Sequence, residues 1–71
     1  MPGKYRGVIL GAKNKVLEEC NFPLCAEDTG AKNTIKSYAS ATFPDHEFVE
    51  VWNGRMKVAK FNRAGTEVDF S

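Results

Sequence analysis

The start of the chain carries a pattern of apolar and polar residues that predicts a pair of strands. Residues Tyr5–Leu10 are rich in aromatic and β-branched side chains, and residues 16–21 repeat this character more weakly. Residues 11–15 between them are polar and typical of a turn. We therefore expect an N-terminal hairpin. A loop over residues 21–26 should follow it, because Pro23 lacks the amide donor that a central strand needs.

The middle of the chain has the spacing of an amphipathic helix. Small and apolar residues recur three or four positions apart at Ala31, Ile35, Tyr38, Ala39 and Thr42. Asp28 or Thr29 can cap the start of this helix, where negative charge also suits the positive end of the helix dipole. Pro44 predicts the end of the helix at Phe43, because proline disfavours helical geometry in the residue before it.

A hairpin is predicted over residues 48–61, and it is the strongest local pattern in the sequence. Asn53 and Gly54 tolerate the positive φ angles of a two-residue type I′ turn. The resulting register pairs Trp52 with Arg55, Val51 with Met56, Glu50 with Lys57, Val49 with Val58 and Phe48 with Ala59. One face of the hairpin would then be apolar and would hold Val49, Val51, Met56 and Val58.

A second turn is predicted at residues 63–65, where the glycine supplies the left-handed position of a three-residue loop. It returns residues 66–70 as a further strand. In this register Val68 lies opposite Lys60, and both Val68 and Phe70 join the apolar face of the hairpin. The C-terminal part of the chain is therefore expected to be a three-stranded meander.

These elements define the expected fold class. The order strand, strand, helix, strand, strand, strand predicts an α+β fold, in which one helix packs on one face of an antiparallel sheet of about five strands. The chain has 71 residues, 42% hydrophobic and 27% charged. This length supports a single small domain over residues 1–71 and excludes multi-domain enzymes, dinucleotide-binding folds and large barrels.

Net charge and hydropathy indicate which kinds of partner and which cellular compartment to expect. A net charge of +1 removes the simplest argument for binding nucleic acid, which usually requires a clear basic excess. The apolar run at residues 8–10 is too short for a signal peptide or a membrane span. We therefore expect a cytoplasmic protein with no membrane attachment.

Candidate catalytic and metal-binding chemistry is sparse. Cys20 and Cys25 are interpreted as reduced thiols, because we expect no secretory signal in this chain. Their spacing is not that of a thioredoxin-type redox motif, and a structural zinc site usually needs four ligands, so a metal- or redox-dependent module is a less favoured alternative. His46 is interpreted as a solvated loop histidine, since no nucleophile can be placed beside it. Glu18 and Glu19 are adjacent on a strand and point to opposite faces. We therefore expect no catalytic residue, no metal site, no cofactor and no enzymatic activity.

Aromatic and basic residues on the exposed sheet face are the best candidates for binding. Tryptophan and arginine are enriched at interface hot spots, and an aromatic and basic sheet can also bind single-stranded nucleic acid. A structural interpretation remains open, in which Trp52 and Arg55 form a cross-strand cation–π pair and Phe48 is covered. Phe61 could share this face. The expected contact residues are Phe48, Trp52, Arg55 and Lys57 on the sheet, with Lys32 and Lys36 on the helix.

A second basic set precedes the first acidic residue of the chain and consists of Lys4, Arg6, Lys13 and Lys15. With the same sheet face, these residues would serve a nucleic-acid-binding alternative. The acidic residues that follow closely make the molecule bipolar, which suits recognition of a protein partner better.

The predicted element order is similar to that of small phage-encoded proteins of the anti-CRISPR type. The residues that carry the resemblance are Val51-Trp52-Asn53-Gly54, Ala59-Lys60, Gly65 and Val68-Asp69. The resemblance implies a non-enzymatic module from a phage or mobile element that binds and inhibits or modulates a host nucleoprotein or protein complex. We expect it to act as a monomer or weak homodimer.

Overall fold

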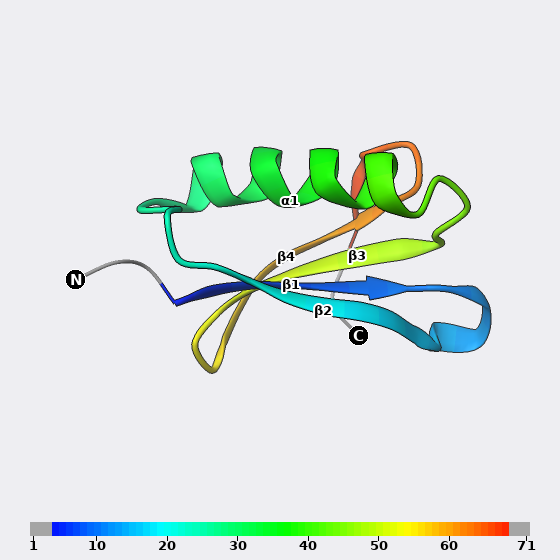
Figure 1. Ribbon diagram of the computed structural model, residues 1–71, viewed down its shortest axis with the longest axis horizontal. Helices are drawn as coiled ribbons and strands as arrows, with labels where there is room; N and C mark the ends of the chain where they lie inside the picture. Colours follow the sequence, from blue (N-terminus) through cyan, green and yellow to red (C-terminus); the bar gives the residue numbers. More distant parts are fainter. Residues whose placement is uncertain (1–3, 69–71) are drawn as a thin grey trace.

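The computed structural model describes residues 4–68, which form a five-stranded antiparallel sheet with one helix on one face (Figure 1). This confirms the predicted element order and fold class. The strands lie in the order β2-β1-β3-β4-β5. The elements are β1 (Tyr5–Leu10), the short 3-10 turn η1 (Ala12–Asn14), β2 (Val16–Phe22), α1 (Asp28–Thr42), β3 (Phe48–Asn53), β4 (Met56–Asn62) and β5 (Glu67–Val68). No helix in the described range is long and apolar enough to cross a membrane.

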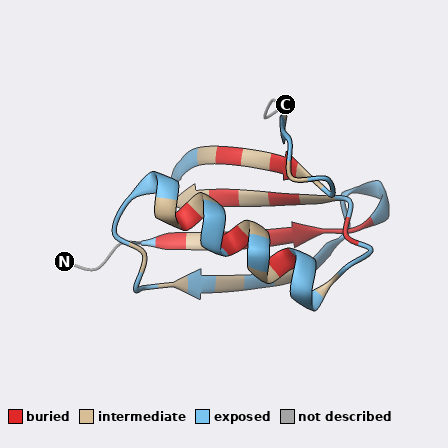
Figure 2. Ribbon diagram, turned by 90° about the horizontal axis from the view of Figure 1, so that it is seen from above, coloured by how far each residue is buried: buried red, intermediate tan, exposed pale blue. Residues whose placement is uncertain are grey.

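The hydrophobic core lies between α1 and the central strands. The helix runs diagonally over the sheet, with its buried positions facing the strands (Figure 2). Its buried residues recur every four positions because only that stripe of the helix faces the sheet. The core consists of Ala31, Ile35 and Ala39 from α1, with Tyr5, Ile9, Val49, Val51, Ala59 and Phe61 from the strands. Full burial of a side chain such as Ile9 or Val51 contributes about 1.5–3 kcal/mol.

Two local features hold α1 in place. A Cβ atom added at Gly7 would lie 2.7 Å from Cγ2 of Ile35, so the helix approaches β1 more closely than any side chain at this position would allow. At the start of the helix, the Tyr5 hydroxyl donates a hydrogen bond to Asp28, which raises the pKa of Tyr5 to about 12. Asp28 therefore binds Tyr5 rather than capping the helix, and Glu27 occupies the N-cap position without a side-chain hydrogen bond.

The β3–β4 hairpin differs from the predicted register. Asn53 pairs with Met56, so the loop residues are Gly54 and Arg55 rather than Asn53 and Gly54. Gly54 has a positive φ of 62°, whereas the φ of Asn53 is not positive. A single glycine at the first loop position suits a type II′ turn, while the predicted type I′ turn needs positive φ at both positions.

A β-bulge adds a second shift to this register, between Val51 and Trp52. Trp52 therefore lies opposite Lys57, and Val51 lies opposite Ala59. The prediction that Met56 joins the apolar face is wrong, since Met56 is 72% exposed. The suggestion that Phe61 shares the exposed face is also wrong, because Phe61 pairs with Val49 and is buried in the core.

The prediction for the β4–β5 hairpin is confirmed in part. Gly65 has a φ of 87° in the turn before β5, and Val68 lies opposite Lys60 as expected. Directly opposed residues share a face of the sheet. Lys60 lies over the Phe48 ring, on the face away from α1, so the prediction that Val68 joins the helix-covered apolar face is wrong. Phe70 lies outside the described residues.

Two glycine-to-alanine substitutions test the close approach of α1 to the sheet. Gly7→Ala should lower the free energy of unfolding by about 1–3 kcal/mol, because overpacking forces the helix and β1 apart. Gly30→Ala should raise it by up to about 1 kcal/mol, because alanine favours helices and the nearest obstacle is Glu27 Cγ at 3.9 Å. Urea unfolding of both variants measures the difference. Equal effects at the two positions would contradict the packing described.

Candidate functional site

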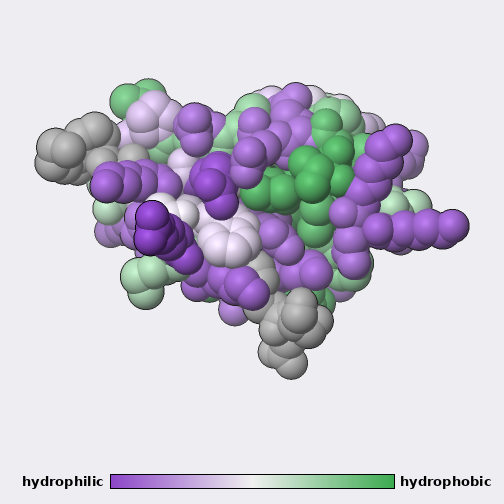
Figure 3. All heavy atoms as spheres, turned by 90° about the horizontal axis from the view of Figure 1, so that it is seen from below, coloured by the Kyte–Doolittle hydropathy of each residue, from purple (hydrophilic) through white to green (hydrophobic). Residues whose placement is uncertain are grey.

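The candidate site is the face of the sheet that α1 does not cover, called here the open face. Alternate residues of β1 and β3 point to it, and the antiparallel register sets them in three cross-strand rows. Hydrophilic side chains surround a patch of apolar side chains on this face (Figure 3). The rows pair Arg6 with Trp52, Val8 with Glu50 and Leu10 with Phe48.

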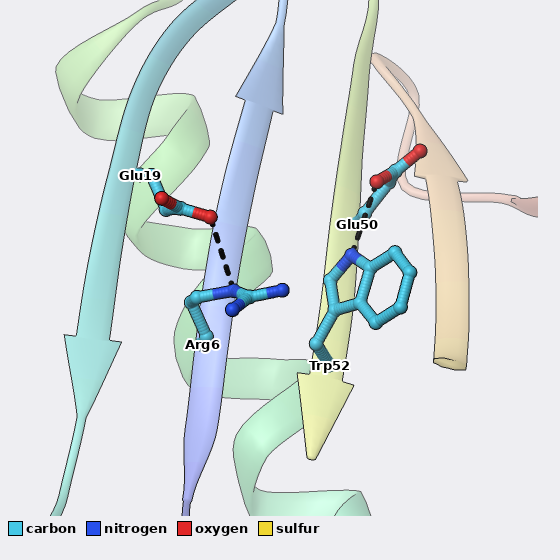
Figure 4. A network of polar contacts seen from close by, with 4 residues as sticks. All are labelled: Arg6, Glu19, Glu50 and Trp52. Carbon is cyan, nitrogen blue, oxygen red and sulfur yellow. Dashed lines mark hydrogen bonds and ion pairs between the residues drawn. The ribbon is translucent and has the colours of Figure 1, made fainter. Parts of the chain in front are cut away.

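Trp52 is the centre of a polar network on the open face (Figure 4). Its indole N–H donates a hydrogen bond to Glu50 Oε1 at 3.1 Å. The Arg6 guanidinium carbon lies 5.4 Å from the centroid of the Trp52 ring, and Lys57 Nζ lies 5.8 Å from it. Both separations are within the range of cation–π attraction.

Arg6 links the tryptophan to the neighbouring edge strand. Its Nε lies 3.1 Å from Glu19 Oε2, close enough for an ion pair. The same Nε is buried, and its N–H has no hydrogen-bond partner of good geometry. The pair therefore attracts by charge rather than through a directed hydrogen bond. Arg6 thus lies between one carboxylate and one aromatic ring.

The apolar residues of the open face are buried although no second layer of helix or strand covers them. Val8 is 8% exposed and Leu10 is 5% exposed, although the helix packs on the opposite side of the sheet. Phe48 pairs with Leu10 in the sheet. Lys60 Nζ lies 4.6 Å from the centroid of the Phe48 ring. Lysine and arginine stems can cover apolar surface while their charged ends stay in water.

The structure brings together three of the predicted contact residues and separates the others. Phe48, Trp52 and Lys57 share the open face. The predicted cross-strand pair of Trp52 and Arg55 is wrong, because Arg55 lies in the exposed turn and Lys57 takes the position opposite Trp52.

Lys32 and Lys36 lie on the flank of α1 that faces β4 and β5, away from the open face. Lys32 Nζ is 3.7 Å from Glu67 Oε1, and Lys36 Nζ is 4.6 Å from the centroid of the Phe61 ring. The two lysines therefore belong to the helix layer and not to the open face that holds Trp52.

The second basic set does not form one patch. The carbonyl of Lys4, just before β1, accepts a hydrogen bond from the Gly54 N–H at 3.0 Å, which places Lys4 at the hairpin end of the sheet. Lys13 and Lys15 lie in and after η1, beyond the other end of β1. A six-residue strand is about 20 Å long, so the set is split. Its member Arg6 lies on the open face, opposite Trp52.

A hydrogen-bonded cluster on the other side of β2 was not predicted. The Cys20 thiol donates to Glu18 Oε2 at 2.8 Å, and the Tyr38 hydroxyl donates to the same oxygen. These two hydrogen bonds, the one from Cys20 more than the one from Tyr38, stabilise the Glu18 carboxylate and lower its pKa. The same bonds to the carboxylate favour the protonated thiol and phenol, so the pKa values of Cys20 and Tyr38 are raised. The spacing of Glu18 and Cys20 places them on one face, but Tyr38 approaches only through tertiary packing.

This cluster is poorly suited to nucleophilic chemistry. A raised pKa keeps the Cys20 thiol protonated, and the thiolate is the reactive form. Cys20 and Cys25 are both free. Among residues 4–68 no group of three His, Cys, Asp or Glu side chains is arranged to hold a metal ion.

His46 is buried, so its interpretation as a solvated loop histidine is wrong. Its exposed fraction is 2%, and its Nδ1 lies 2.7 Å from the Phe43 carbonyl oxygen. A carbonyl only accepts, so Nδ1 must carry the proton. The His46 backbone N–H also donates to this carbonyl at 3.0 Å, which folds the segment after Pro44 back onto the helix end. His46 therefore has a structural role.

Comparison with family models, with curated proteins and with solved structures gives no match for this chain. The resemblance to anti-CRISPR proteins in element order therefore stays a prediction.

The lowered pKa of Glu18 predicts a pH-dependent contribution to stability. A carboxyl group whose pKa is lower in the folded state stabilises the fold above its unfolded pKa, near 4.5, and this contribution is lost as the pH falls through the folded value. Glu18→Gln should therefore destabilise the protein at pH 7 and have less effect below both pKa values. Urea unfolding at both pH values measures this, with the exposed Glu47→Gln as control. Equal destabilisation at both pH values would contradict it.

Proposed function

We propose that the chain is a small non-enzymatic binding module that contacts a protein partner through the open face of its sheet. The observation that carries this proposal is that the helix covers only one face of the sheet. The helix buries one face, while the other presents Trp52 and Phe48 beneath cations, next to the apolar Val8 and Leu10. Aromatic anchors surrounded by polar groups that exclude water are typical of interface hot spots.

The charges on the open face favour a protein partner over nucleic acid. Arg6, Lys57 and Lys60 share this face with Glu19 and Glu50. Carboxylates on the same face repel phosphates, whereas a mixed surface can complement a mixed surface on a protein. A stacking platform for bases also needs an accessible aromatic ring. Arg6 and Lys57 lie over the Trp52 ring, and the residue is only partly exposed, so nucleic acid is the weaker alternative.

The finer part of the proposal concerns the target. The similarity of element order to small phage-encoded proteins of the anti-CRISPR type supports a host nucleoprotein or protein complex as the partner. In this proposal the chain acts in the cytoplasm and inhibits or modulates that complex by occupying part of its surface.

An affinity pulldown with tagged protein from a bacterial lysate, with and without nuclease, tests the proposal. A stoichiometric protein partner should persist after nuclease treatment, and its affinity for variants can then be measured by calorimetry. Trp52→Ala should weaken binding by about 30-fold, equivalent to about 2 kcal/mol, because it removes the central anchor. Asn33→Ala, on the exposed side of α1, should bind like the wild type.

A second pair of variants keeps the test valid if Trp52→Ala unfolds. Lys57→Glu reverses an exposed charge beside Trp52, and Lys15→Glu makes the same change before β2. We expect the first to weaken binding by about tenfold and the second to have little effect. Loss of all partners with nuclease would favour nucleic acid, and equal binding of both charge variants would exclude the open face.

A further inference from the structure

The edge of the sheet at β2 offers a second interaction surface, distinct from the open face. Among the described residues β2 pairs only with β1, and it lies at one edge of the sheet with no strand beyond it (Figure 2). A shift of register between Ile9 and Leu10 disturbs only the start of β2, which leaves residues 18–22 in regular pairing. In an antiparallel edge strand, alternate residues direct their N–H and C=O groups outward. These groups can pair with an added strand.

An apolar hollow of about 450 Å³ adjoins this edge. It lies where β2 ends and the chain turns towards the helix, and Phe22, Pro23, Cys25, Gly30 and Thr34 line it. Leu24, also part of its lining, is 97% exposed. Because Asn21 and Phe22 at the end of β2 also line the hollow, a strand paired along β2 passes beside it.

Charge along the edge indicates what kind of strand fits. Glu18 and Glu19 lie in the regular part of β2, where Glu19 also pairs with Arg6. Glu27 and Asp28 lie at the start of α1, beyond the hollow, where Asp28 accepts a hydrogen bond from Tyr5. Hydrogen bonds from Cys20 and Tyr38 hold Glu18 in its ionised form. Opposite charges across neighbouring strands stabilise pairing. The edge therefore favours a strand that carries lysine or arginine.

The same charges disfavour a second copy of this chain. Two β2 strands that pair in antiparallel fashion bring four glutamates into one ladder, and registers with the twofold axis at Glu18, at Glu19 or between them set glutamates directly opposite one another. Directly opposed like charges are destabilising, and charged residues on an edge strand are a common protection against self-association.

We propose that residues 18–22 and the adjoining hollow dock an extended, basic segment of a protein partner, which pairs with β2 and inserts an apolar side chain into the hollow. This mode of recognition takes affinity from main-chain hydrogen bonds and specificity from a side-chain pocket. The inference goes beyond the proposed function, because it uses the sheet edge and can hold or fail independently of the open face.

The test uses a defined peptide and backbone amide NMR of the full chain. The probe is an acetylated and amidated heptapeptide in which lysine alternates with valine and leucine, and its matched control has glutamate in place of lysine. The lysine peptide should shift the amide signals of residues 18–22 and Gly30 saturably, with a Kd of about 1 mM or tighter. It should also slow exchange of the outward amides of β2 by tenfold or more. The glutamate peptide should do neither.

Two leucine variants on the helix test the hollow. Gly30→Leu adds a side chain to the lining of the hollow, and the Cβ atom of that side chain meets no atom nearer than 3.9 Å. This variant should bind the lysine peptide at least tenfold more weakly, whereas Asn33→Leu, which adds the same side chain outside the hollow, should bind like the wild type. Trp52→Ala should also bind the peptide normally, which separates this inference from the open-face proposal. Lys57→Glu provides the same separation if Trp52→Ala unfolds.

Four results of the peptide experiments would overturn the inference. These are no response at residues 18–22 in excess peptide, an equal response to both peptides, equal binding by Gly30→Leu, and a response confined to the open face. If the signals of residues 18–22 instead move as the concentration of the protein alone is raised, the edge binds a second copy and the proposal is wrong.

Discussion

The close packing of Ile35 against Gly7 determines how the rest of the molecule is arranged. Because β1 has no side chain at Gly7, α1 can lie directly on the centre of the sheet and bury its stripe of Ala31, Ile35 and Ala39. A single helix of this length covers one face only (Figure 1). The opposite face and the β2 edge must therefore be stabilised by side chains or by a partner. Both candidate surfaces follow from this constraint.

The two surfaces are joined through β1 and β2. On the open face the Arg6 guanidinium is shared between Glu19 and the Trp52 ring, so a charge on the edge strand is linked to the aromatic centre. On the other side of the same strand, Glu18 accepts hydrogen bonds from Cys20 and Tyr38, which ties the edge to α1. Adjacent glutamates on β2 thus anchor opposite faces of the sheet.

The sequence predicted what local patterns determine and missed what pairing between distant strands determines. The helix, its end before Pro44 and the turn at Gly65 depend on residues close in sequence, and they match the structure. Trp52 was identified as a surface aromatic by its alternation, but its contact with Arg6 requires β1 to pair with β3. The positions of Met56 and Phe61 depended on turn type and on a bulge, neither of which the Asn-Gly pair determined.

Because the chain has a single tryptophan, its fluorescence reports directly on the open face. The most direct measurement is acrylamide quenching of Trp52 in the free protein and in complex with the protein partner recovered from the lysate. A partner seated on the open face should reduce the quenching constant severalfold, because it excludes the quencher from the indole. An unchanged quenching constant in a saturated complex would contradict the account and place the binding surface elsewhere on the molecule.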